Sequence, residues 1–186
     1  AQTDIAHYTW RILPELAEAT DLIIWTDAQD WDRALHHIAP VRHLDPDGIT
    51  PRDFALAGRR GGGPGAGPEA VFVNIGNAWP FHAGFLRMIQ RLPSIVVLHD
   101  MAIQEMLYDS IRYDGFDPDL YTAGMTRWYG AEGATLAQDL LATNIDAQQV
   151  ARVAPGFELT MDRAISVLSH TQMAYDAVTA RGVLPA

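Results

Sequence analysis

The chain has 186 residues, 48% of them hydrophobic, which suffices for one α/β domain with a hydrophobic core but not comfortably for two. Its formal net charge is -10, from 23 acidic and 13 basic residues. Such a surface repels phosphate backbones and anionic lipid headgroups, so we expect no nucleic-acid binding and no membrane attachment through a general basic surface. The chain has no cysteine, which excludes disulfides, thiolate metal sites and thiol catalysis.

The beginning of the chain lacks the basic region and following apolar run of a signal peptide. No apolar run approaches the roughly 20 residues of a membrane span. We therefore expect a soluble cytoplasmic protein without a transmembrane segment. Because the sequence starts with Ala1 rather than Met, we also expect that its N-terminus is trimmed.

The first predicted element is a helix over residues 5–19, with Thr3 or Asp4 as its cap and apolar side chains on one face. Pro14 falls inside this pattern and should kink or loosen the helix. A short apolar run rich in β-formers follows at 21–26 and predicts a buried strand.

Residues 27–69 contain five prolines and a glycine-rich run, and we expect them to be irregular. A glycine-rich run can cradle phosphate, but this one lacks the GxxxxGK[ST] order and no strand leads into it. We therefore predict a mobile surface loop over 57–68.

From residue 70 onward, apolar runs alternate with helical patterns. The predicted elements are a strand at 70–75, a helix at 82–91, a strand at 95–98, a helix at 102–112, a helical insertion at 118–160, a strand at 164–168 and a helix at 170–181. Strands that alternate with helices indicate a Rossmann-like parallel sheet with helices on both faces. The whole chain is expected to be a single domain of this class.

Polar side chains follow every predicted strand, and ligands of open parallel sheets bind outside the carboxyl ends of the strands. We therefore expect a site at that edge. The residues concerned are Thr26 and Asp27 after the first strand, Asn74, Gly76, Asn77 and His82 after the second, His99 and Asp100 after the third, and Ser169 and His170 after the fourth.

These residues also have structural interpretations, which the sequence leaves open. Asp100 and Ser169 are suited to helix N-caps. The asparagines around the glycine suit a tight turn. His99 can be a satisfied structural histidine, and His82 can simply face the flank of a helix. Other chemistries lack their motifs, since the chain has no GxSxG, HExxH or GxGxxG.

Residues 5–16, residues 75–82 with 96–100, and residues 165–172 together resemble the retaining GT-B glycosyltransferases of family 4. Residues 5–16, IAHYTWRILPEL, are similar to the "G-I-A-x-Y" helix of that family. Residues 75–82, IGNAWPFH, and 96–100, VVLHD, resemble the "GN…FH…VVLHD" signature of one subgroup. Residues 165–172, ISVLSHTQ, are similar to the "viVhSe" strand that precedes the link between the two domains.

The resemblance implies the acceptor-side, N-terminal half of an enzyme that transfers a sugar from a nucleotide-sugar donor to an acceptor with retention of configuration. The family's first strand would precede Thr3, and the second domain, with the E-x7-E motif that holds the nucleotide-sugar, would follow Ala186. The isolated chain is then expected to be inactive. Neither a metal nor another cofactor is expected, because helix dipoles and cationic groups of the second domain would hold the diphosphate.

By position, the resemblance assigns His99 to the histidine that reaches the transferred sugar, with Asp100 orienting it. The acceptor side would be lined by Asn74, Gly76, Asn77, His82 and Ser169. The acceptor itself is not identified. Two other classes stay open: a non-catalytic Rossmann-like binding or docking module, and a small independent hydrolase that uses His99 and Asp100. A second α/β domain with E-x7-E in the parent gene would favour the transferase.

Overall fold

The structure is a computed structural model, and it describes residues 4–58 and 70–182. Most of the loop predicted over 57–68 lies outside these residues. The chain divides into two compact units, residues 1–70 and 71–186, and each is described here by itself. Within the described residues, no helix combines the length and the apolar character needed to cross a membrane.

The first unit contains a two-stranded parallel sheet and two α-helices. Its elements are α1 (Asp4–Ala19), β1 (Ile24–Thr26), the 3-10 helix η1 (Arg33–His37), β2 (Val41–His43) and α2 (Pro51–Gly58). The predicted helix is confirmed, with Pro14 inside α1. The first predicted strand is confirmed as β1, but the prediction that it is buried is wrong, because all three of its residues are half-buried. The prediction that 27–69 is irregular is wrong at η1, β2 and α2.

Strand β2 was not predicted from the sequence because it has only three residues, of which Val41 alone is apolar. It forms through pairing with β1 rather than through its own propensity. The amide of Ile24 donates to Pro40 O at 2.9 Å, and the amide of Leu44 donates to Thr26 O at 2.8 Å. Tertiary pairing of this kind overrides a weak local signal.

The second unit contains a three-stranded sheet in the order β3-β4-β5, and the predicted parallel pairing of these strands is confirmed. Its elements are β3 (Phe72–Ile75), α3 (Trp79–Ile89), β4 (Ser94–Leu98), α4 (Gln104–Tyr113), α5 (Pro118–Leu141), α6 (Ala147–Ala151), the 3-10 helix η2 (Phe157–Thr160), β5 (Ala164–Ser169) and α7 (Gln172–Ala180). Central strand β4 is the most apolar and most buried, as a strand covered on both faces should be.

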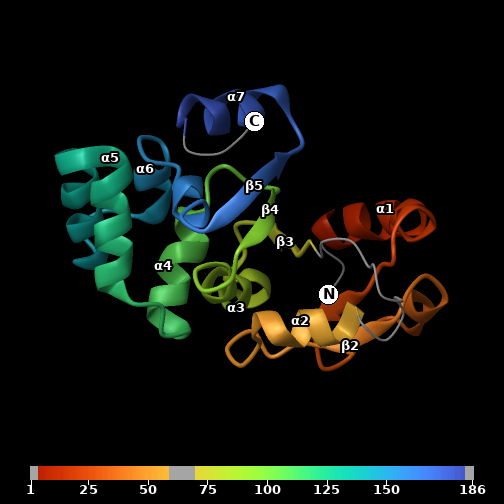
Figure 1. Cartoon of the computed structure of the whole chain (residues 1–186). Coiled ribbons are helices and arrows are strands. Elements are labelled where there is room, and N and C mark those ends of the chain that lie inside the picture. Colours follow the sequence, from red (N-terminus) through yellow and green to blue (C-terminus); the bar gives the residue numbers. More distant parts are fainter. Residues whose placement is uncertain (1–3, 59–69, 183–186) are drawn as a thin grey trace. The chain divides into compact units, whose positions relative to one another are not determined.

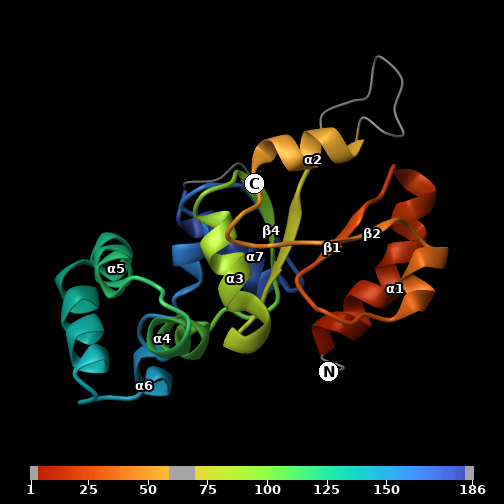
Figure 2. The same ribbon diagram turned by 90° about the horizontal axis from the view of Figure 1, so that it is seen from below.

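Helices cover both faces of this sheet, because α3 and α7 lie on opposite sides of it (Figure 1). The predicted helical insertion at 118–160 is confirmed as α5, α6 and η2. Helices α4, α5 and α6 lie together at one end of the unit in both views (Figure 2). Helix α5 is kinked at Gly130, whose φ of 67° and ψ of -148° lie outside the helical region.

Candidate functional site

The carboxyl ends of β3, β4 and β5 lie at one edge of the second unit. The register pairs Ile75 with Leu98 and Leu98 with Ser169, so the residues that follow these three strands are neighbours in space. The predicted alignment of these three strand ends is confirmed. The end of β1, with Thr26 and Asp27, belongs to the first unit, and its place at the same edge stays a prediction.

His99 is the best-positioned ionisable side chain at this edge. Its backbone amide donates to Ile75 O at 2.9 Å, which continues the β3–β4 ladder by one residue. Its Nε2 lies 2.8 Å from Asn74 Oδ1, and because an amide oxygen only accepts, Nε2 carries the hydrogen. The ring also packs on His170, with centroids 4.6 Å apart and planes inclined by 33°.

The environment of His99 disfavours the imidazolium form. Partial burial, together with the neighbouring His170 and His82, lowers the pKa of His99 to about 4, while the charge of Asp100 acts in the opposite direction. His99 is therefore a neutral imidazole at pH 7, able to exchange hydrogen bonds without carrying a charge.

The Asp100 carboxylate holds the loop that follows β3. Its Oδ2 accepts from the backbone amide of Asn77 at 2.8 Å, and the His99 ring donates from Nε2 to Asn74 Oδ1. Asp100 does not cap α4, whose N-cap residue is Ile103. The interpretation of Asp100 as a helix cap is therefore wrong.

The side chain of Asn77 joins two loops. Its Oδ1 accepts from the amide of Met106 at 3.1 Å, which caps the first turn of α4 from outside that helix. Its Nδ2 donates to Glu105 Oε2, also at 3.1 Å. Together with the bond to Asp100, these contacts tie the loop after β3 to the loop after β4.

The remaining predicted residues, His82, Gly76 and Ser169, lie close to this edge of the sheet. His82 is buried on α3, with Nδ1 3.2 Å from the backbone oxygen of Asn74, and Gly76 is buried in the turn after β3. Ser169 ends β5 and does not cap α7, because Thr171 is the N-cap and accepts from Ala174 N at 3.2 Å. The interpretation of Ser169 as that cap is therefore wrong.

A pocket of about 320 Å³ opens at this edge. Its polar lining comes from His99, Asp100, His170 and Thr171, and apolar side chains, including the exposed Met173, complete it. No arginine lines this pocket within the described part of the chain. Its volume lies in the range of small-ligand sites.

The buried side chain of Gln104, at the start of α4, holds the segment that contains Ala154. Gln104 Nε2 donates to Ala154 O at 2.7 Å, and its Oε1 accepts from Tyr121 Oη at 2.7 Å. Ile103 N donates to Pro155 O at 2.9 Å. Gly156 completes this joint because its φ is +96° and a Cβ there would lie 2.9 Å from Gln104 Nε2.

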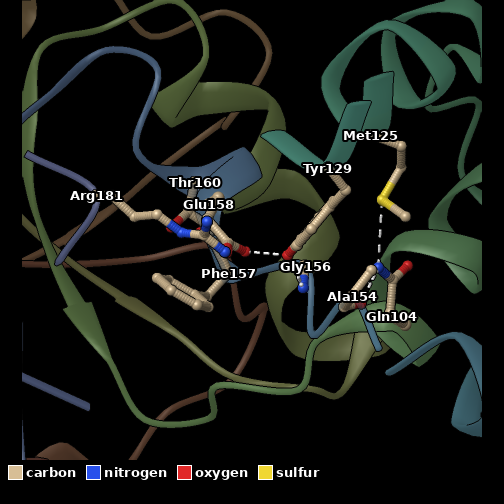
Figure 3. Close-up of polar contacts among 9 residues, drawn as sticks. All are labelled: Gln104, Met125, Tyr129, Ala154, Gly156, Phe157, Glu158, Thr160 and Arg181. Atoms are coloured by element: carbon tan, nitrogen blue, oxygen red, sulfur yellow. Dashed lines mark hydrogen bonds and ion pairs between the residues drawn. The ribbon is translucent and has the colours of Figure 1, made fainter. Parts of the chain in front are cut away.

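A second buried polar cluster surrounds Glu158, whose exposed fraction is 0%. Its carboxylate accepts from Tyr129 Oη on α5 and pairs with Arg181 at the end of α7 (Figure 3). Tyr129 Oη in turn accepts from Gly156 N at 2.8 Å. Burial, and then the hydrogen bond to Glu158, raise the pKa of Tyr129 far above its usual range, so the phenol stays a donor.

Sequence reasoning missed Gln104, Glu105 and Glu158. The hydrogen-bond partners of all three lie far away in the chain. For Glu158 these partners are Tyr129 and Arg181. The one signal was a lone acid in the stretch Gly156–Thr160, which is too weak to interpret by itself. Over residues 4–58 and 70–182, no group of three or more His, Asp or Glu side chains is arranged to hold a metal ion.

Comparison with known proteins finds no matching family model, no matching curated protein and no matching solved structure.

Proposed function

We propose that this chain is the acceptor-side domain of a retaining glycosyltransferase that transfers a sugar from a nucleotide-sugar to an acceptor hydroxyl. The observation that carries the proposal is the neutral His99 imidazole, held by Asn74 on the wall of a pocket at the carboxyl ends of parallel strands. The motif resemblance around 75–82 and 96–100 points to the same residue.

The composition of the pocket supports a sugar better than a diphosphate. A sugar hydroxyl both donates and accepts. Nδ1 of the neutral His99 imidazole is an acceptor, because its hydrogen is on Nε2, and the hydroxyl of Thr171 can both donate and accept. Asp100 in the same lining is an acceptor for further hydroxyl groups, and its charge opposes a phosphate. The donor's diphosphate would then be held by the second domain that the resemblance implies.

In this proposal His99 acts at the reacting centre by hydrogen bonding. A positioned imidazole stabilises the transition state if its hydrogen bond becomes stronger as charge develops at the reacting centre. Asn74 orients the ring. Asp100 fixes the adjacent loop through Asn77, and its charge also acts on the imidazole.

The test is sugar transfer by the natural full-length protein, with labelled nucleotide-sugars and a panel of hydroxyl acceptors. His99→Ala should lower turnover by about 10²-fold or more, the usual scale for a positioned transition-state group, with little change in melting temperature. His37→Ala, at an exposed histidine of the first unit, is the matched control and should leave turnover unchanged.

Two outcomes would contradict the proposal. Full activity in a stably folded His99→Ala protein removes His99 from the mechanism. A full-length protein that transfers no sugar to any acceptor, yet binds a protein partner through this unit, would instead support the non-catalytic docking module.

A further inference from the structure

A second pocket, of about 400 Å³, lies between the start of α4 and α6. It adjoins the pocket at His99, because Ala102 lines both. Its polar lining includes Asn77 and Glu105 on one side and Gln148 and Arg152 of the α6 segment on the other. Of its lining residues only Asn77 was expected at the acceptor site, and the volume of the pocket accommodates a sugar-sized molecule.

The carboxylate of Glu105 is held in place within this lining. Its Oε2 accepts from Asn77 Nδ2 at 3.1 Å, and its Oε1 accepts from Gln148 Nε2 at 3.0 Å. Both donors are neutral amides, and no ion pair to Glu105 forms among the described residues. Each oxygen keeps a second lone pair, so the carboxylate can still accept from a ligand.

Arg152 supplies the opposite charge in the same pocket. It is exposed at the C-cap of α6, four residues after Gln148, so both side chains lie on the same face of the helix. In the part of the chain that the structure describes, its guanidinium pairs with neither Glu105 nor another carboxylate. The pocket therefore presents a fixed anion and a separate cation, with amides beside them.

We propose that this second pocket binds a sugar unit that carries an anionic group, a carboxylate or a phosphate, as part of the acceptor. Arg152 pairs with the anionic group, since its planar fork matches both oxyanions. Glu105 accepts from sugar hydroxyls, and Gln148 fixes Glu105 in place.

This inference rests on the proposed function, because it makes the ligand an acceptor. Since Ala102 lines both pockets, the unit bound here lies next to the unit at His99. The acceptor is then a chain of at least two linked units, with the negative charge one unit away from the reacting hydroxyl.

The test is a titration of the isotope-labelled 186-residue chain, followed by amide NMR shifts. The probes are methyl β-glucuronide and glucose 6-phosphate, which carry the two kinds of anion, and methyl β-glucoside is the neutral match. We expect at least one acidic probe to shift the amides of Glu105, Gln148 and Arg152 with saturation, and the glucoside to bind at least about tenfold more weakly.

Substitutions of Arg152 and Glu105 test which part of the ligand each residue binds. Arg152→Gln should weaken the acidic probe at least about tenfold. Glu105→Gln should weaken the neutral probe, and the acidic probe less, because it also removes a negative charge that repels the probe's anion. Arg163→Gln, at another exposed arginine of the same unit, is the control and should change nothing. Far-UV circular dichroism verifies that each variant is folded.

The inference is overturned if neither acidic probe shifts these amides, if the glucoside binds as well as the acidic probes, or if Arg152→Gln has no effect. The failure of the proposed function is distinguishable. Saturable, Arg152-dependent binding without any transfer by the full-length protein would contradict only the transferase, whereas transfer unaffected by Arg152→Gln would contradict only this pocket.

Discussion

The ion pair between Glu158 and Arg181 should contribute measurably to the stability of the second unit. We consider Arg181→Met, which keeps most of the aliphatic length and removes the cation. The carboxylate of Glu158 is fully buried and would keep only the hydroxyl of Tyr129 as a partner. Breaking a buried pair from one side costs about 3–5 kcal/mol.

The expected cost here is lower than that range. The Arg181 side chain is 34% exposed, so water already screens part of the attraction, and water can enter when the guanidinium is removed. We therefore expect the free energy of unfolding to fall by about 2–3 kcal/mol. A second variant, Glu158→Gln, keeps the shape of the side chain without its charge.

Urea unfolding followed by circular dichroism measures this free energy. The double variant Glu158→Gln/Arg181→Met should be more stable than the sum of the two single losses predicts, because the cation and the buried charge are removed together. Arg163→Met, at an exposed arginine, is the control and should lie within about 0.5 kcal/mol of the natural chain. A loss of less than about 0.5 kcal/mol for Arg181→Met, or simple additivity of the pair, would refute the reasoning.

Two further predictions concern pH and backbone strain. The folded-state pKa of His99, about 4 against a usual 6.5, means that the unfolded chain binds more protons between these values. Stability is thus full above about pH 6.5 and declines as pH falls through this window, by about 1–2 kcal/mol after allowance for partial exposure. Unfolding at several pH values should show that His99→Gln removes this dependence and His37→Gln does not, and an unchanged slope in His99→Gln would contradict the assignment. Gly156→Ala should lower the free energy of unfolding by about 2 kcal/mol, because the φ of Gly156 is +96° and the new Cβ would meet Gln104. The control is Gly115→Ala, at φ +70° in open space, which should cost only about 1 kcal/mol. Equal losses of stability in thermal melts would argue against the close contact at Gly156.

The sequence predicted the second unit well because its strands are continuous apolar runs bounded by turns. Strands β3, β4 and β5, their parallel order and the helical excursion follow from that alternation. In the first unit the same reasoning failed at η1, β2 and α2, because these elements are short and prolines interrupt the local pattern there. Pairing with β1 and the edge-on packing of Phe54 against Trp25, 5.3 Å between ring centroids, supply what local propensity lacks.

The position of the candidate site was predictable, but its contacts were not. Parallel strands place His99, Asp100 and Ser169 at one edge whatever the details of the loops. Which of them touch depends on loop geometry. Asn74 holds His99, and Asp100 binds the amide of Asn77 instead. The functional roles of these residues stay predictions until activity is measured.

The attachment of Arg181 also matters for mechanical load. Residues at the ends of helices commonly fray, because their last carbonyls lack partners. Here the residue directly after α7 is fastened to a carboxylate in the interior, and that carboxylate is bonded to α5. For a pull on the chain beyond this point to unwind α7 from its end, it must also break the attachment of Arg181 to Glu158 in η2. A shortened version of the protein that ends before Arg181 would lose this anchor, so a boundary for expression of the second unit belongs after it.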